Sequence, residues 1–238
     1  MRGKNILITG ASSGIGKETA EYLASQGACV ILAARSEERL QQAAAQIGER
    51  AYVYPCDLQK PEDIAGLFQY IREQNVTLDG MVHSAGIAKP VPVRTENMVN
   101  AEETMRINCL SFLELGKQFF NRKHSQKGAS VVAISSMAAV RPVMGQASYA
   151  SSKAALNSIV EVMSQEFLKR EIRVNAIMPS YVATPMVNSD AGYGMNNGIE
   201  NMPLGVIDPR QIAYLVEFLL SDRSLHITGA AIPVTSGV

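Results

Sequence analysis

A tyrosine, a lysine and a serine are spaced so that they could transfer a proton together. Tyr149 and Lys153 lie four residues apart, and Ser136 precedes Tyr149 by thirteen residues. If Tyr149 begins a helix, Lys153 lies one turn further along the same face. A lysine ammonium should lower the pKa of a nearby phenol from about 10 toward working pH, which makes the phenol a usable general acid or base. Ser136 could then hydrogen-bond a substrate oxygen on which charge develops. The same Tyr–Lys spacing also arises by chance in many helices.

A glycine-rich turn near the N-terminus gives that chemistry a context. An apolar run over residues 4–9 predicts a buried strand, and it leads directly into Gly10, Gly14 and Gly16. Helix-forming residues follow from residue 18 to residue 24. Glycines let the backbone approach a pyrophosphate, and a helix start offers free N–H groups and a positive dipole end. Alone, this motif is equally compatible with an ordinary turn.

Taken together, the motifs resemble those of the short-chain dehydrogenase/reductase family. The likeness runs from about residue 4 to about residue 236, with the family's order and usual spacings. The matched stretches are Thr9–Gly16, Asp57-Leu58, Ser84-Ala85-Gly86, Asn108, Ser135-Ser136, Tyr149 with Lys153, and Pro179 with Thr184. The resemblance implies an oxidoreductase that moves a hydride between a nicotinamide and a carbonyl or alcohol substrate.

Three stretches depart from the family's pattern. His83-Ser84 replaces the common Asn-Asn, Pro179-Ser180 replaces Pro-Gly, and Thr235-Ser236-Gly237 replaces Asp-Gly-Gly. None of these changes removes a catalytic group. They could alter the rigidity of the loops near the nicotinamide.

The composition indicates a compact enzyme. Among 238 residues, 47% are hydrophobic, enough for a full core, and 22 basic residues balance 22 acidic ones. That balance argues against nucleic-acid or anionic-membrane partners. No apolar run approaches the about 18 residues of a membrane span, and no signal peptide precedes the first strand. The cysteines and histidines show no metal-binding spacing, and three scattered cysteines indicate free thiols in a reducing, cytoplasmic setting.

Alternating strand and helix patterns predict one domain over residues 1–238. We expect a Rossmann-like, doubly wound α/β fold, with a parallel sheet of about seven strands and helices on both faces. The expected strands cover residues 4–9, 28–33, 51–55, 78–83, 129–135, 172–178 and 230–234. The expected helices include residues 61–73, 97–120, 149–169 and 209–220, and a further helix is capped by Ser36.

Ligands of such sheets bind beyond the carboxyl ends of the strands. The motif residues follow these ends and should therefore line one crevice: Gly10, Arg35, Asp57, Ser84, Ser136 and Pro179. The resemblance supplies the occupant, a nicotinamide dinucleotide with its adenine near Asp57 and its nicotinamide near Tyr149. The cofactor contacts that it implies are Gly10, Ser12, Ser13, Gly14, Ile15, Gly16, Arg35, Ser36, Asp57, Leu58, Ser84, Ala85, Gly86, Tyr149, Lys153, Pro179, Val182 and Thr184.

Arg35 favours NADP over NAD. An acidic residue after the second strand would bind the ribose 2′-OH of NAD, whereas an arginine accommodates the 2′-phosphate of NADP. Ala34 stands where the family's NAD enzymes usually carry an acid, and Arg35 with Ser36 could hold a phosphate. Against this, Ser13 lies where many NADP-dependent relatives have a basic residue, and Lys17 compensates only if it turns back toward the loop. A solvated Arg35 is the alternative.

The remaining catalytic assignments depend on the resemblance. Ser136 is preferred to Ser135 because it lies at the family's usual distance from Tyr149. In relatives, the residue equivalent to Asn108 carries a water that links the lysine to solvent, although Asn108 could equally be a satisfied interior polar group. Asp57 could instead form a turn, and Thr184 could cap the next helix.

The substrate is the least constrained part of the prediction. Residues 186–203 suggest a mobile lid, with Gly192, Gly194 and Gly198 giving flexibility and Met186, Tyr193, Met195 and Met202 giving apolar contact, as could Val143 and Met144. We expect a partly apolar ketone or alcohol, and Arg141 could meet an anionic group or lie in solvent. The alternatives are a non-catalytic NADP sensor or scaffold, or an epimerase or dehydratase. Relatives pair helices 97–120 and 149–169 between subunits, which implies a homodimer or homotetramer.

Overall fold

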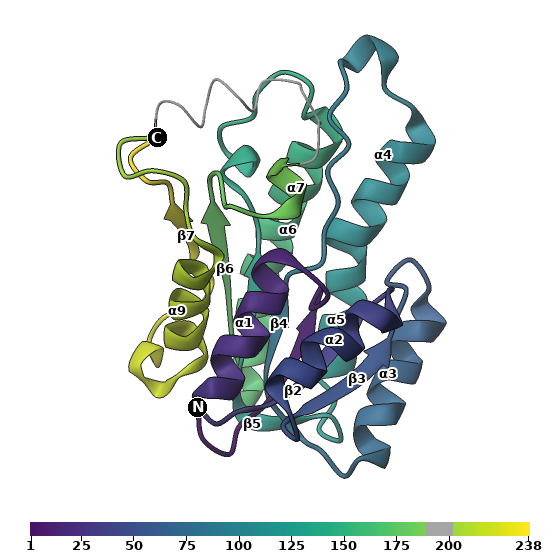
Figure 1. Cartoon of the computed structure of the whole chain (residues 1–238), viewed down its shortest axis with the longest axis vertical. Coiled ribbons are helices and arrows are strands. Elements are labelled where there is room, and N and C mark those ends of the chain that lie inside the picture. Colours follow the sequence, from purple (N-terminus) through teal and green to yellow (C-terminus); the bar gives the residue numbers. More distant parts are fainter. Residues whose placement is uncertain (189–201) are drawn as a thin grey trace.

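The computed structural model describes residues 1–188 and 202–238, which build one seven-stranded parallel sheet (Figure 1). The strand order is β3-β2-β1-β4-β5-β6-β7. The chain therefore changes direction across the sheet between the neighbouring strands β1 and β4, the position where doubly wound sheets bind ligands. The strands are β1 (Asn5–Thr9), β2 (Cys29–Ala34), β3 (Ala51–Pro55), β4 (Leu78–His83), β5 (Ser125–Ile134), β6 (Arg173–Pro179) and β7 (Ala231–Val234).

Helices cover both faces of this sheet, so the predicted doubly wound fold is confirmed. One buried cluster joins the sheet to α3, α5 and α6 through Phe68, Phe112 and Leu156, and the other joins it to α1, α2 and α9. Leu7 belongs to the first cluster and its neighbour Ile8 to the second, as the alternation of a strand requires. The helices are α1 (Gly14–Ser25), α2 (Glu37–Ile47), α3 (Pro61–Glu73), α4 (Met98–Met105), α5 (Ser111–Phe119), α6 (Ala147–Glu166), α7 (Pro185–Asn188) and α9 (Pro209–Leu220).

Several helix starts follow local rules that the sequence displays. Ser36 caps α2 by accepting a hydrogen bond from the Arg39 amide, and Pro61 occupies the first turn of α3. Asp208 and Gln211 form a reciprocal capping box at the start of α9. These caps place the helices that return the chain to the amino ends of the strands.

The helix expected over residues 97–120 is present from Met98 to Phe119, but it is not a regular α-helix throughout. A π-helical turn, Arg106–Leu110, joins α4 to α5 and contains Asn108. The Asn108 side chain bonds to Ile87 and Ser152, and these tertiary contacts hold the wider turn in place. Such turns often mark functional sites.

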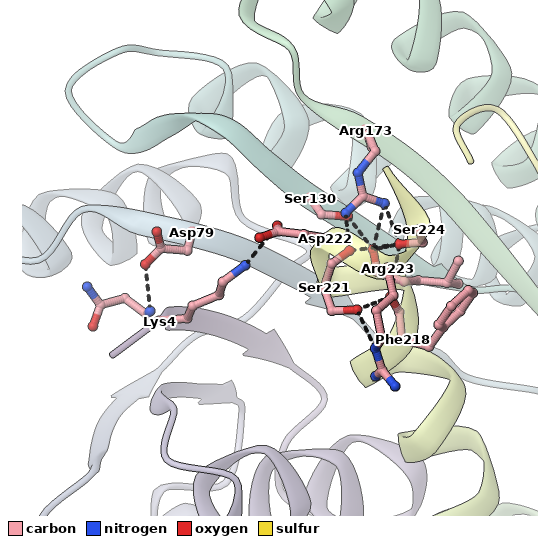
Figure 2. A network of polar contacts seen from close by, with 11 residues as sticks. Lys4, Asp79, Ser130, Arg173, Phe218, Ser221, Asp222, Arg223 and Ser224 are labelled. Atoms are coloured by element: carbon pink, nitrogen blue, oxygen red, sulfur yellow. Dashed lines mark hydrogen bonds and ion pairs between the residues drawn. The ribbon is translucent and has the colours of Figure 1, made fainter. Parts of the chain in front are cut away.

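A buried arginine fastens α9 to the amino edge of the sheet (Figure 2). Arg173 of β6 donates to the carbonyl of Leu219 at 2.7 Å, to that of Ser221 at 3.1 Å and to the hydroxyl of Ser224 at 2.8 Å. Ser130 of β5 donates to the same Leu219 carbonyl at 2.9 Å. These bonds satisfy carbonyls that the end of a helix leaves without partners. The opposite edge, at the carboxyl ends of the strands, stays open to a ligand.

No helix in the described part of the chain is long and apolar enough to cross a membrane.

His83, at the end of β4, is a fully buried imidazole. Its Nδ1 shares a hydrogen bond of 2.9 Å with the Thr9 hydroxyl, and its ring packs 5.3 Å from that of Phe112. Its Nε2 has no hydrogen-bond partner among the described residues. Burial, reinforced by the charge of Lys153 and opposed by the main chain of Asn108, lowers the His83 pKa from 6.5 to about 3. The fold therefore holds this histidine neutral.

We expect His83 to make the protein sensitive to mild acid. Because the unfolded chain binds a proton near pH 6.5 and the folded chain only near pH 3, the stability that the neutral imidazole confers is full above pH 6.5 and is lost as the pH falls toward 3. The slope should approach about 1.4 kcal/mol per pH unit for this one group. His83→Asn should remove this component, whereas His226→Asn, at an exposed position, should keep it. Urea unfolding between pH 7 and pH 4.5 measures the slopes, and equal slopes in wild type and His83→Asn would contradict the expectation.

Candidate active site

A cavity of about 1140 Å³ lies beyond the carboxyl ends of the strands. It is lined by nearly all the residues that the sequence singles out: Gly10, Ser12, Ser13, Gly14, Ile15, Arg35, Ser36, Asp57, Leu58, Ser84, Ala85, Gly86, Ser136, Tyr149, Lys153, Pro179, Val182 and Thr184. Gly16 and Asn108 lie behind its wall. The expected convergence on one crevice is therefore present in the structure.

The glycine turn has the geometry of a phosphate cradle. Gly10 has a φ of 69°, and a Cβ there would lie 2.7 Å from the Ala85 amide nitrogen. Gly14 begins α1 with a φ of 54°, and a Cβ on Gly16 would collide with the Gly10 carbonyl. The Ser13 side chain makes no capping bond, so the first N–H groups of α1 stay available to an anion. These residues fit a dinucleotide pyrophosphate.

Arg39, in the first turn of α2, escaped the sequence reasoning. It lines the same cavity as Arg35, which lies just before α2, and Glu38 is also part of that lining. The available signal was a second arginine close to Arg35 in the sequence. Lys17 does not turn back toward the glycine loop, because its Nζ lies 3.5 Å from Glu21. Arg35 and Arg39 are therefore the basic residues of this part of the lining, and their binding of a 2′-phosphate stays a prediction.

Asp57 lines the cavity and also forms a turn. Its Oδ1 accepts a hydrogen bond of 3.1 Å from the Gln59 amide, and its own amide donates to Asp63 at 3.0 Å. Both roles considered for Asp57 are thus compatible with the structure.

The serine, tyrosine and lysine meet at the opposite end of the cavity. Ser136 lies two residues after the end of β5, and Tyr149 and Lys153 lie one turn apart on α6, with Lys153 Nζ 5.9 Å from the centre of the Tyr149 ring. Lys153 Nζ donates to the Ile134 carbonyl at 2.8 Å. The Ser135 hydroxyl instead donates to the main-chain carbonyl of Lys153 at 3.3 Å. Ser136 therefore faces the tyrosine while Ser135 braces the helix that carries it.

The expected lowering of the Tyr149 pKa is wrong for the protein chain by itself. Burial raises the pKa of Tyr149, and the hydrogen bond with Ser136 only partly offsets this. Burial also lowers the pKa of Lys153 to about 8, against a smaller opposing effect of Cys109. Desolvation thus outweighs the hydrogen bond from Ser136 and favours the neutral phenol. A neutral phenol is a proton donor.

Asn108 is a positioning residue behind the catalytic end. Its amide donates to the Ile87 carbonyl at 2.9 Å and to the Ser152 hydroxyl at 3.0 Å, and its Oδ1 accepts from the Ile87 amide at 2.8 Å. A Cβ on Gly86 would lie 3.3 Å from Asn108 Oδ1 and 3.4 Å from Lys153 Nζ. Both amide hydrogens and one acceptor site of Oδ1 join three segments around Lys153, which matches the interior polar group considered from sequence. A water relay through Asn108 stays a prediction.

The substrate end of the cavity combines apolar and polar groups. Val143 and Met186 line it as expected, together with Arg141. Gln146 and Tyr181 also line it and were not anticipated. Met202 was expected to contact substrate but is buried in the core with Ile207, and Met144 is 86% exposed outside the lining. Gly192, Tyr193, Gly194, Met195 and Gly198 of the expected lid lie outside the described residues.

Across residues 1–188 and 202–238, no group of three or more His, Cys, Asp or Glu side chains could hold a metal ion. Cys29, Cys56 and Cys109 are free thiols.

Comparisons with known proteins find matches that span nearly the whole chain. A family model described as enoyl-(acyl carrier protein) reductase matches residues 10–238. A curated 3-oxoacyl-[acyl-carrier-protein] reductase FabG from Vibrio cholerae is 29% identical over 239 residues, covering 100% of this chain and 98% of that protein. An acetoacetyl-CoA reductase from Allochromatium vinosum is also 29% identical, covering 98% and 97%. A solved short-chain dehydrogenase/reductase family protein is 30% identical, with a TM-score of 0.86 over 99% of this chain and 97% of that one.

We expect Arg39→Ala to weaken the binding of NADPH about ten-fold and to leave the binding of NADH nearly unchanged. A guanidinium that bonds the 2′-phosphate has no partner in NADH, and charge-assisted bonds of this kind contribute roughly this much. Titration by nicotinamide fluorescence measures both dissociation constants. Lys17→Ala, whose ammonium is paired with Glu21, is the matched control and should not discriminate. An equal loss for both cofactors in Arg39→Ala would contradict the role.

Proposed function

The chain belongs to the short-chain dehydrogenase/reductase family of oxidoreductases, and from this we propose that it is an NADPH-dependent reductase of ketones such as 3-oxoacyl thioesters. The observation that supports it most strongly is the meeting of Ser136, Tyr149 and Lys153 at one end of a cavity whose other end carries Arg35 and Arg39. The relatives named as 3-oxoacyl-[acyl-carrier-protein] and acetoacetyl-CoA reductases suggest the substrate class.

Each side chain has a separate task in the proposed reaction. NADPH, when bound along the cavity, supplies the hydride. Ser136 hydrogen-bonds the ketone oxygen and fixes it beside the phenol, and Tyr149 donates its proton to that oxygen as negative charge develops there. Lys153, whose Nζ lies 5.9 Å from the centre of the Tyr149 ring, supplies a positive charge that stabilises the phenolate that remains. The raised pKa of Tyr149 keeps the proton in place before the reaction, which suits reduction.

The wall next to these groups suits a substrate with an apolar part. Ile87, Val143 and Met186 line this end, and Gln146 offers an amide. Apolar pockets with a few convergent polar groups are the usual form of small-molecule sites. A short 3-oxoacyl chain fits that description.

We also propose that the protein assembles as a homodimer or homotetramer through α4, α5 and α6. Val99 of α4 is 70% exposed, Leu113 of α5 is 50% exposed and Val162 of α6 is 54% exposed. Exposed apolar side chains on neighbouring helices support a surface that a second copy covers.

We expect Tyr149→Phe to lower kcat for ketone reduction by about 10²- to 10⁴-fold, because the variant keeps the ring but has no proton to donate. The dissociation constant for NADPH should change much less. Initial rates with a 3-oxoacyl thioester, followed by NADPH absorbance, test this. Tyr70→Phe on α3, outside the cavity lining, is the control and should retain the rate. A Tyr149→Phe variant with most of its kcat would refute the proposed role.

A further inference from the structure

Arg141 is an arginine at the catalytic end of the cavity without an ion-pair partner among the described residues. The carboxylate side chains in the described lining are those of Glu38 and Asp57, which follow β2 and β3 at the adenosine end. Around Ser136 and Tyr149 the charged side chains in that lining are Arg141 and Lys153. The charged side chains at this end are therefore basic.

The loop that carries Arg141 is braced. The Arg141 amide donates to the Met137 carbonyl at 2.8 Å, which closes the turn that begins at Ser136. Pro142 follows and restricts the backbone of Arg141. Further along the loop, the Val91 amide donates to the Gly145 carbonyl at 2.9 Å. The guanidinium thus extends from a fixed point five residues after Ser136.

Four arginines elsewhere in the described fold already have partners. Arg210 pairs with Glu18 and Arg223 with Glu217, whereas Arg170 and Arg173 donate to main-chain carbonyls. In the described cavity lining, Arg35 and Arg39 lie unpaired at the adenosine end, where we propose that they hold a phosphate. Arg141 is the corresponding free guanidinium at the catalytic end, and its planar fork matches a carboxylate or a phosphate.

We propose that Arg141 determines substrate specificity by binding an anionic group of the ketone substrate, either a carboxylate or a phosphate. The inference rests on the proposed ketone reductase activity and narrows its substrate class. A phosphate would come from the pantetheine arm of a thioester, and a carboxylate from a free oxo acid.

Two matched substrate pairs test the proposal. Acetoacetyl-CoA is compared with the uncharged acetoacetyl thioester of N-acetylcysteamine, and acetoacetate with its methyl ester, all with NADPH and the full chain at low salt. Arg141→Ala should lower kcat/KM for the charged member of one pair about ten-fold more than for its neutral partner. A selective loss with the CoA thioester identifies a phosphate, and one with acetoacetate a carboxylate.

The controls separate this proposal from the proposed function. Arg141→Lys should recover part of the preference for the charged substrate because it keeps the charge. Arg94→Ala, which changes an exposed arginine outside the lining, should not alter that preference.

The outcomes distinguish the two proposals. If the neutral substrates are reduced and Arg141→Ala affects both members of each pair equally, the role of Arg141 is overturned and the reductase activity is not. Reduction of none of the four would overturn the reductase. In that case, quenching of bound-NADPH fluorescence by phosphopantetheine or acetoacetate tests whether Arg141 binds an anion. Weaker quenching in Arg141→Ala than in wild type would support its role, and equal quenching would overturn it.

Discussion

The close approach of the glycine turn to the end of β4 is the constraint on which the site depends. Gly10 has no room for a Cβ because the Ala85 backbone lies against it, and the Thr9 hydroxyl accepts from the Ala85 amide and bonds to buried His83. These contacts join β1 to β4 where the strand order changes direction. They form the floor of the cavity and align the start of α1 with its phosphate-binding edge. Larger side chains here would separate the two strands and close the cradle.

At the other end of the cavity, desolvation decides the protonation states. Burial raises the pKa of Tyr149 from its ordinary value and lowers that of Lys153 to about 8, so the two pKa values move apart. The phenol therefore keeps its proton, and Lys153 gives up its charge more readily than a solvated lysine. The π-helical turn at Asn108 and the bond from Ser135 to the Lys153 carbonyl keep α6 in position. Residues behind the cavity wall thus position the side chains that we propose to be catalytic.

Much of the fold and of the candidate site could be predicted from short stretches of the sequence. The seven strands, the cap at Ser36, Pro61 and the spacing of Ser136, Tyr149 and Lys153 depend on residues close together in the chain. The structure differs from the prediction where segments distant in sequence determine a local feature. The turn at Asn108 follows from contacts with Ile87 and Ser152, the direction of the Tyr149 pKa from burial, and the burial of Met202 from the core around Ile207. The pairing of Lys17 with Glu21 is local and could have been read from its helical spacing.

Direct transfer of hydrogen from cofactor to substrate is the central claim, and an isotope experiment tests it most directly. The purified protein would be incubated with NADPH carrying deuterium at the transferable position of nicotinamide C4 and with a 3-oxoacyl thioester, and the product analysed by mass spectrometry and NMR. The account predicts one deuterium on the new carbinol carbon. Cofactor oxidation without deuterium in the product, or no reduction of any ketone, would contradict it.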